Sequence, residues 1–279
     1  MKKGSLFLAV LFPAVLAGAG KCAMGQEDIV SAVPVGLHTG EKIHYNAFSH
    51  NDYKRHRPLK DALSYHFNGV EADIWLIKGE VYVGHAKPIL CRKARKFENM
   101  YLNPLIARLE ANGGKVYPGS NRPFLLMVEF KNNAEELYEV LKTKLEPYRE
   151  YFCALEDGGY QDGAVLLYIS GKRPVRTLER EQTRFMFLDG MIQELGTGKP
   201  ATLMPVVSDN YRNYFTWRGR GEMPEEEKQR MGRILDWCHS EHKLFRWWGV
   251  RKMTVKKLFL EMGVDLIGTD NLKKLHRML

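Results

Sequence analysis

The amino-acid sequence predicts an α/β fold, a closed (β/α)8 TIM barrel. Short apolar segments of strand length alternate with segments of helical period, and this order can be followed eight times along the chain. Such alternation is typical of a parallel sheet covered by helices. Residues 26–279 contain no Pro/Gly/Ser-rich linker and no internal repeat, so a single domain of ordinary barrel size is expected there.

Residues 1–25 have the layout of a secretory signal peptide. Two lysines precede an apolar run from Leu6 to Leu16, and small residues follow it. The run is shorter than a bilayer span. A lipoprotein signal centred on Cys22 is disfavoured, because Lys21 stands where a small residue is expected. We therefore expect an exported protein, periplasmic or extracellular, without a membrane span in its mature chain.

The first half of the chain predicts three strand and helix units. The third strand is an unbroken apolar run, and the helix after it has an asparagine available as N-cap and acidic and apolar residues at helical spacing. A short antiparallel strand is predicted beside the second strand. The predicted strands are Ile43–Ser49, Val70–Ile77, Val81–Gly84 and Phe124–Phe130, and the predicted helices are Leu59–Phe67, Tyr101–Asn112 and Ala134–Tyr148.

The second half predicts five more strands but fewer helices. A weak or missing helix is expected between the fifth and sixth strands. The segment from Ser208 to Glu222, rich in Tyr, Arg and Gly, is expected to be a loop, either a lid or a surface insertion. The predicted strands are Ala164–Ile169, Arg184–Leu188, Leu203–Val207, Leu244–Trp248 and Asp265–Gly268, and the predicted helices are Pro174–Glu181, Pro224–Glu241 and Thr254–Met262.

The second predicted strand carries two acids on one face. Side chains alternate across a strand, so Glu71 and Asp73 leave the same face and Val70, Ala72 and Ile74 leave the other. In a sheet covered by helices, two unpaired carboxylates would repel each other and lose their hydration. A positive partner is therefore expected between them.

Further polar residues follow the other strand ends, which meet at one face of a parallel barrel. Glu129 ends the third strand, and the carboxylates of Glu71, Asp73 and Glu129 together predict a site for one divalent cation, Ca²⁺ or Mg²⁺, because both prefer oxygen ligands. His50 follows the first strand and His85 follows the short antiparallel strand, and two histidines on separate loops beside such a site suit paired proton transfer as general acid and base.

The remaining polar residues suit a phosphoryl group, although each has a plainer interpretation. Lys131 is expected to hold a phosphoryl oxygen. Taken alone, Glu129 and Lys131 would be an ion pair inside the barrel, and a lone histidine beside a turn would be structural. Five such features in order at the first three strand ends favour a site. The residues that form this series and end the last strand are His50, Glu71, Asp73, His85, Glu129, Lys131 and Asp270.

The charge and the cysteines narrow the possible ligands. The formal net charge of +9 favours an anionic ligand. Basic residues cluster after His50 and after His85 but form no stripe interleaved with aromatic residues, so nucleic acid is not expected as a partner. Cys91, Cys153 and Cys238 lack the spacing of a disulfide framework or a zinc site. A Cys91–Cys153 disulfide is left open.

The ordered motifs resemble the glycerophosphodiester phosphodiesterase and phosphatidylinositol-specific phospholipase C superfamily. Its members carry a first His, Glu-x-Asp, a second His and Glu-x-Lys on a TIM barrel, which match SHNDY, VEADIW, VYVGHAK and MVEFK here. GVDLIGTDN is similar to the last strand of that family, and RWWGVR to its tryptophan-bearing seventh strand. The resemblance covers nearly the whole mature chain and implies a barrel of this phosphodiesterase type.

The resemblance also implies roles for individual residues. It makes His50 and His85 the acid/base pair, Glu71, Asp73 and Glu129 the metal ligands, and Asn51, Lys131, Arg246 and Trp248 the substrate-binding residues. The family pattern has Arg where this chain has Asn51, so that phosphate contact is either absent or supplied elsewhere, with Arg55 and Arg57 as the candidates. Ala86 stands where the family tends to have Asp. Both departures place the chain in an outlying branch and put selectivity for a glycerol head group in doubt.

These observations predict an exported, metal-dependent phosphoric diester hydrolase acting on a small or lipid-derived phosphodiester. Attack by a neighbouring substrate hydroxyl, which gives a cyclic phosphate, and direct attack by water are both open. One alternative is a secreted barrel glycosidase that uses Glu71 or Asp73 with Glu129. The other is a catalytically silent barrel that binds a phosphate ester. Sequence does not predict the oligomeric state.

Overall fold

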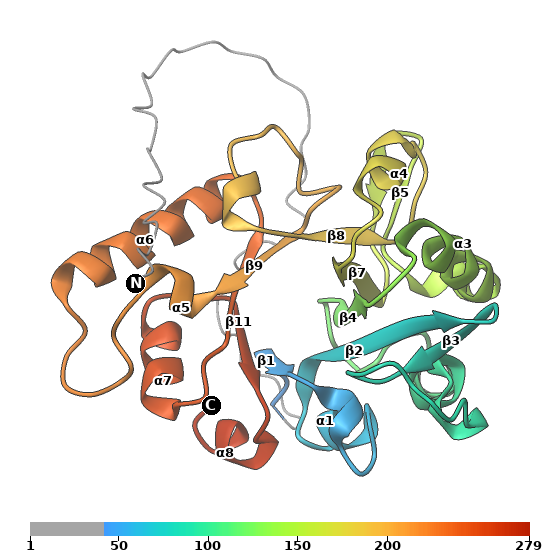
Figure 1. Cartoon of the computed structure of the whole chain (residues 1–279), viewed down its shortest axis with the longest axis horizontal. Coiled ribbons are helices and arrows are strands. Elements are labelled where there is room, and N and C mark those ends of the chain that lie inside the picture. The colour runs from blue at the N-terminus through green and yellow to red at the C-terminus, as the bar shows by residue number, and fades with distance from the viewer. Residues whose placement is uncertain (1–41) are drawn as a thin grey trace, which may run out of the picture.

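Eight parallel strands form a closed barrel, which confirms the predicted fold (Figure 1). The computed structural model describes residues 42–279, so the predicted signal peptide lies outside the described residues. The strand order is β1-β11-β10-β9-β8-β7-β4-β2, and pairing of β1 with β2 closes the ring. The eight strands are β1 (His44–Ser49), β2 (Phe67–Ile77), β4 (Phe124–Phe130), β7 (Val165–Gly171), β8 (Phe187–Gly190), β9 (Val206–Asn210), β10 (Leu244–Trp248) and β11 (Leu266–Thr269).

Helices lie outside the ring of strands (Figure 1). The predicted helices are all present with shifted ends, and only the short turn η5 (Ile192–Glu194) separates β8 from the approach to β9. The α-helices are α1 (Lys60–Ser64), α2 (Asn103–Ala111), α3 (Ala134–Leu145), α4 (Val175–Arg180), α5 (Tyr211–Tyr214), α6 (Glu225–Ser240), α7 (Met253–Glu261) and α8 (Leu272–His276). The other short helical segments are η1 (Asp52–Lys54), η2 (Lys93–Arg95), η3 (Glu98–Leu102) and η4 (Glu146–Tyr151).

Three short strands lie outside the barrel ring. β3 (Glu80–Val83) pairs antiparallel with β2, as predicted. β5 (Ala154–Glu156) and β6 (Gly159–Gln161) form a hairpin that the sequence did not predict.

The fifth and sixth strands begin about three residues later than predicted. Arg184 exchanges backbone hydrogen bonds with Leu155, so it belongs to a bridge beside the hairpin and not to β8. The amides of Leu203 and Met204 donate to the carbonyl of Pro200, so these residues close a turn before β9 begins. The predicted loop from Ser208 was therefore wrong at its start, since its first residues complete β9 and α5 follows directly.

The barrel has two hydrophobic layers. The smaller cluster has nine buried residues, of which eight, Phe48, Met127 and Tyr168 among them, come from alternate positions of the strands and the ninth is Cys153, just before β5. The larger cluster contains the opposite strand faces and the helices. Gly69 lies on the same face of β2 as Glu71, and a Cβ there would stand 2.6 Å from Phe48, so the close strand packing requires glycine. Glu71 and Asp73 are thereby directed to the inner face of the barrel.

Two predictions concerning cysteines and membranes can be compared with the described residues. Within residues 42–279, Cys91 is exposed, Cys153 is buried, and no cysteine forms a disulfide. The Cys91–Cys153 bond left open by the sequence is therefore absent from the structure. No helix in this part of the chain is both long and apolar enough to cross a bilayer.

Acid should weaken the fold through His44, at the start of β1. Its side chain is buried and its Nε2 lies 3.0 Å from His276 Nδ1 of α8. Burial, assisted by the positive charge that His276 can carry, lowers the pKa of His44 to about 4. His44 therefore binds a proton below about pH 6.5 in the unfolded chain but only below about pH 4 in the folded chain. We expect this group to remove about 2 kcal/mol of unfolding free energy between about pH 7 and pH 5.

Urea unfolding of wild type and His44→Gln at both pH values measures this contribution. The variant should lose less unfolding free energy on acidification than wild type. His56→Gln is the matched control, because His56 is exposed and should leave the pH dependence unchanged. Equal pH dependence in wild type and His44→Gln would contradict the assignment.

Candidate active site

Three carboxylates converge at the C-terminal ends of β2 and β4. Asp73 lies directly beside Glu129 in the register of these strands, and Glu71 precedes Asp73 on the same face. One carboxylate oxygen from each of the three lies within 4.8 Å of the others. Glu71 and Asp73 are buried, whereas Glu129 is half-buried. The structure thus brings together the three predicted metal ligands.

Positive side chains lie against this acid cluster. Lys131 Nζ is 2.9 Å from Asp73 Oδ2 and 2.6 Å from Glu129 Oε1, and Arg246 Nη1 is 3.6 Å from Glu71 Oε2. Burial works to lower the pKa of Lys131, but its bonds to the two carboxylates outweigh burial and raise it. Burial raises the pKa of Glu71, while the nearby His50 and Arg246 oppose that rise. The positive partner expected between the acids is therefore supplied in part by Lys131.

The acid cluster has the donor set of a hard divalent cation. Asp73 Oδ1 is buried and has no hydrogen-bond partner among the described residues, although Asp73 Oδ2 is fully engaged. An unsatisfied buried carboxylate oxygen is costly. Oxygen ligands lie about 2.3–2.6 Å from Ca²⁺, so one ion spans oxygens separated by about 5 Å. Glu71, Asp73 and Glu129 therefore fit a Ca²⁺ or Mg²⁺ site.

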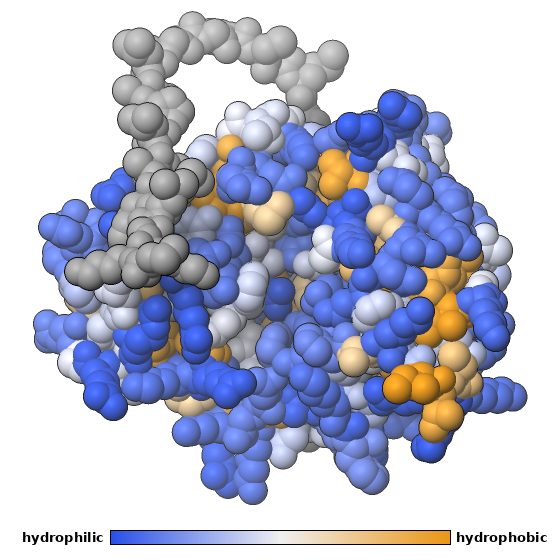
Figure 2. Space-filling model, in the orientation of Figure 1, coloured by the Kyte–Doolittle hydropathy of each residue, from blue (hydrophilic) through white to orange (hydrophobic). Residues whose placement is uncertain are grey.

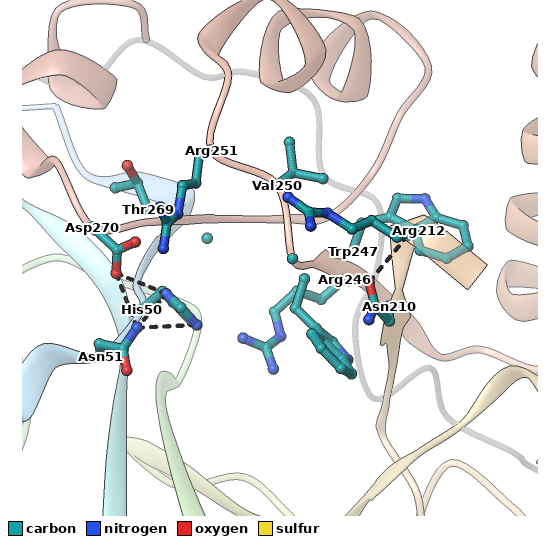
Figure 3. A pocket seen from close by; sticks show the side chains of 13 residues that line it. His50, Asn51, Asn210, Arg212, Arg246, Trp247, Val250, Arg251, Thr269 and Asp270 are labelled. Carbon is teal, nitrogen blue, oxygen red and sulfur yellow. Dashed lines mark hydrogen bonds and ion pairs between the residues drawn. The ribbon is translucent and has the colours of Figure 1, made fainter. Parts of the chain in front are cut away.

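His50 lies on one flank of the acid cluster, directly after β1. Its Nδ1 is 2.8 Å from Asp270 Oδ1 (Figure 3). Its Nε2 faces Glu71 Oε2 at 3.9 Å. The hydrogen bond from His50 holds the pKa of Asp270 well below its usual range. The amide nitrogen of Asn51 also lies 2.8 Å from Nδ1. Asp270 and Asn51 thus hold the imidazole by Nδ1, and the tautomer in which Nδ1 donates to Asp270 leaves Nε2 for proton transfer.

His85 lies on the other flank, after β3. Its Nδ1 is 2.9 Å from Asp73 Oδ2 and 3.2 Å from the hydroxyl of Tyr53, while its side chain is 67% exposed. Burial, and then the charge of Asp73, raise the pKa of Tyr53, so this hydroxyl keeps its proton. The two predicted histidines thus contact opposite ends of one acid cluster, His50 at Glu71 and His85 at Asp73.

Asn51 stands where the family pattern has Arg, and Arg55 and Arg57 follow it. All three side chains form contacts within the protein. Asn51, in the left-handed region at φ 51°, donates from its amide to Asp270 and accepts from Tyr53. Arg55 donates to Ser49 and to the backbone of β11 and the following turn, and Arg57 pairs with Asp61. Neither arginine lines the cavity beside His50, and the suggestion that one of them replaces the family arginine stays a prediction.

A cavity of about 490 Å³ opens beside His50. Arg246 and Trp248, two of the predicted substrate-binding residues, lie in its wall, and so does Asn51. Arg212 and Arg251 also line it, and Figure 3 shows the side chains of all three arginines reaching toward the same open space. Within residues 42–279, no carboxylate pairs with Arg212 or Arg251. The cavity is therefore suited to an anion.

Sequence reasoning missed several residues of this site. Tyr53 and the bond from His50 to Asp270 were not predicted, although the motifs SHNDY and GVDLIGTDN contain the residues. Arg212 and Arg251 lie outside strands, where the sequence gives no positional signal. Asp189 was missed because its strand was placed too early, yet its buried carboxylate accepts from Ser208 inside the barrel.

Comparison with known proteins agrees with this architecture. A family model described as an AIM6-like phosphodiesterase domain matches residues 39–189, more than half of the chain. The chain belongs to this family. It is 26% identical to Altered inheritance of mitochondria protein 6 of Kluyveromyces lactis over 295 residues, covering 82% of this chain and 70% of that protein. The Saccharomyces cerevisiae protein of the same name is 23% identical over 272 residues, covering 80% of this chain and 68% of its own.

A solved structure supports the fold of this family member. A glycerophosphodiester phosphodiesterase from Parabacteroides distasonis matches 84% of the AIM6-like chain and 97% of its own, with a TM-score of 0.50 and 12% identity. At that identity the likeness concerns the fold alone. The chain therefore shares its barrel fold with that phosphodiesterase.

Proposed function

We propose that this protein is a metal-dependent phosphoric diester hydrolase acting on a small or lipid-derived phosphodiester. One observation carries the proposal. His50 Nε2 and His85 flank an oxygen-rich cluster, with His50 3.9 Å from Glu71 and His85 2.9 Å from Asp73. Two imidazoles on either side of one cation site are the arrangement that phosphodiester cleavage needs, because one proton must leave the nucleophile and another must reach the leaving group.

The residues divide the work as follows. His50, oriented by Asp270, accepts or donates a proton at Nε2, and His85, oriented by Asp73, acts on the other side of the substrate. Glu71, Asp73 and Glu129 would hold a divalent cation, which when bound would stabilise negative charge on a phosphoryl oxygen. Lys131 exchanges part of its contact with the carboxylates for a substrate oxygen. The nucleophile is water or a hydroxyl of the substrate.

The cavity beside His50 receives the rest of the substrate. Its three arginines select an anionic molecule, and Trp248, 42% exposed, offers a flat apolar wall. A small uncharged glycerol group would leave Arg212 and Arg251 without a partner. The residues that line the cavity therefore favour a substrate whose head group is larger or more negatively charged than glycerol.

Removal of divalent cations tests the proposal. Turnover of a generic aryl phosphodiester should fall at least tenfold in chelator and return with Ca²⁺ or Mg²⁺, because Glu71, Asp73 and Glu129 lie close enough to share one ion. The readout is initial rate with each metal in turn, with Glu71→Gln as the variant that should weaken metal dependence. Turnover that ignores chelation would contradict the metal-dependent mechanism.

A catalytically silent, phosphate-ester-binding barrel is the second candidate. The pairing of Lys131 with both Asp73 and Glu129 favours it, since the cluster is then partly neutralised without a cation. This candidate predicts saturable binding of a phosphate ester without turnover under any metal condition. Hydrolysis of an aryl glycoside that ignores chelation would instead support the glycosidase alternative. The exported location is also a proposal, and identifying the mature N-terminus of the native protein tests it.

A further inference from the structure

The segment after His85 forms an exposed basic loop, residues 86–96. The described chain exposes four large hydrophobic side chains, and two adjacent ones in this loop are the most exposed, Ile89 at 96% and Leu90 at 63%. The face in Figure 2 is mostly hydrophilic, with small separate hydrophobic patches. Two neighbouring aliphatic side chains held in solvent forgo the stabilisation that burial would give them. Their exposure requires an explanation outside the folded core.

The charge around this pair identifies the kind of partner. Residues 86–96 contain five basic residues and no acidic residue. Lys87, Arg92 and Lys93 are exposed, and within residues 42–279 no carboxylate forms an ion pair with any of them. Exposed aliphatic side chains flanked by free basic ones match a surface that offers negative charge above an apolar interior. An anionic lipid bilayer has this structure.

The base of the loop is fixed to the candidate active site. The loop begins directly after His85, and Arg95 near its end donates to the backbone carbonyl of Tyr53 at 3.4 Å. Lys96 pairs with Glu80 of β3 at 2.9 Å. A bilayer that holds Ile89 and Leu90 therefore also holds the His85 side of the site close to the lipid head groups.

We propose that the basic loop docks the protein on anionic lipid bilayers, with Ile89 and Leu90 inserted and Lys87, Arg92 and Lys93 at the head groups. The substrate is then a phosphodiester presented at the bilayer surface. The substrate class rests on the proposed function, whereas the docking rests on the loop alone. Docking of this kind gives the protein a reversible means of reaching a lipid substrate.

Sedimentation with vesicles tests the docking. Wild-type protein should bind vesicles of phosphatidylcholine with about one third phosphatidylserine far better than phosphatidylcholine alone, and added salt should weaken binding. Ile89→Ser with Leu90→Ser should lower the partition coefficient at least tenfold. The triple change Lys87→Ser, Arg92→Ser and Lys93→Ser should lower it about fivefold for each residue.

A control variant separates the loop from overall charge. The triple change Lys257→Ser, Lys273→Ser and Lys274→Ser removes the same charge from exposed positions of α7 and α8 and should leave binding unchanged. A Leu90→Trp variant gives a second measurement, since brominated lipid should quench its added emission on anionic vesicles. Failure of wild type to sediment, equal binding by the Ile89/Leu90 variant, or equal loss in the control overturns the proposal.

Two further outcomes keep the docking and the proposed function apart. Turnover of a soluble aryl phosphodiester without vesicle binding overturns the docking only. Loop-dependent vesicle binding without turnover supports the docking and counts against the hydrolase. A dimer in light scattering that dissociates in the Ile89/Leu90 variant, without vesicle binding, overturns the docking in favour of a second copy as the partner.

Discussion

Replacing His50 with alanine is expected to lower kcat/KM of the metal-loaded protein for an aryl phosphodiester by about 10²–10⁴. The imidazole is held at Nδ1 by Asp270 at 2.8 Å, and Nε2 faces the acid cluster. Alanine removes the proton-transfer group and leaves Glu71, Asp73 and Glu129 in place. Initial rates measure the effect, and calorimetric titration with Ca²⁺ should show that metal binding is kept.

His56→Ala is the matched control for this change. His56 is exposed, six residues along the same segment, and should leave the rate unchanged. Full activity of His50→Ala with bound metal would contradict the role given to His50. Loss of activity together with loss of metal binding would mean that His50 supports the metal site instead.

Asp270 acts through His50, so its effect should depend on that residue. Asp270→Asn removes the charged acceptor and should lower kcat by about tenfold, because the ring of His50 is then less well oriented. The double variant His50→Ala with Asp270→Asn should be no slower than His50→Ala alone. Additive losses would show that Asp270 contributes independently of the imidazole.

The sequence was informative where a strand is apolar throughout or carries a regular pattern. The bounds predicted for β4 and β10 match the structure, since β4 begins with a continuous apolar run and β10 is apolar and aromatic except for Arg246. The alternation in VEADIW placed Glu71 and Asp73 on one face, and the barrel gave that face to its interior. Because the C-terminal ends of the barrel strands meet at one face, Glu129 and the two histidines were predicted to lie beside these two acids.

Local sequence patterns could not predict contacts between residues that lie far apart in the chain. Arg184 forms a bridge with Leu155, so β8 begins later than predicted and includes Asp189, which the prediction left out. No short-range sequence signal indicates a hydrogen bond to a distant hairpin. The bond from His50 to Asp270 joins residues 220 positions apart. Lys131 was expected to face a phosphoryl group, yet in the structure it bridges two carboxylates. The choice among partners for a cation depends on distances that a sequence does not contain.

The second large effect concerns stability and falls on Arg246, inside the barrel. Its guanidinium is 4% exposed, lies over the ring of Phe48 at 4.8 Å from the ring centre and faces Glu71 at 3.6 Å. Burial raises the pKa of Asp189, and the positive charge of Arg246 opposes that rise. Arg246→Met keeps a similar side-chain length but removes the cation that faces buried Glu71 and that also favours the charged form of buried Asp189. We expect a loss of about 3–5 kcal/mol in the free energy of unfolding.

Urea unfolding without added metal measures this loss. Arg57→Met is the matched control, because its partner Asp61 is on the surface and the pair should contribute about 0–1 kcal/mol. A loss below about 1 kcal/mol for Arg246→Met would contradict the view that Arg246 compensates buried charge.

A second substitution separates charge from packing. Adding Asp189→Asn to Arg246→Met removes one of the two buried negative charges that Arg246 compensates. It also keeps an acceptor for Ser208, which donates to Asp189 at 2.6 Å. If uncompensated charge causes the loss, the double variant should be more stable than Arg246→Met alone. If the loss comes from the missing contact with Phe48, Asp189→Asn should restore nothing. The first outcome would mean that the arginine predicted to meet substrate phosphate also holds the barrel interior together, so its effects on catalysis must be measured at equal folded fraction.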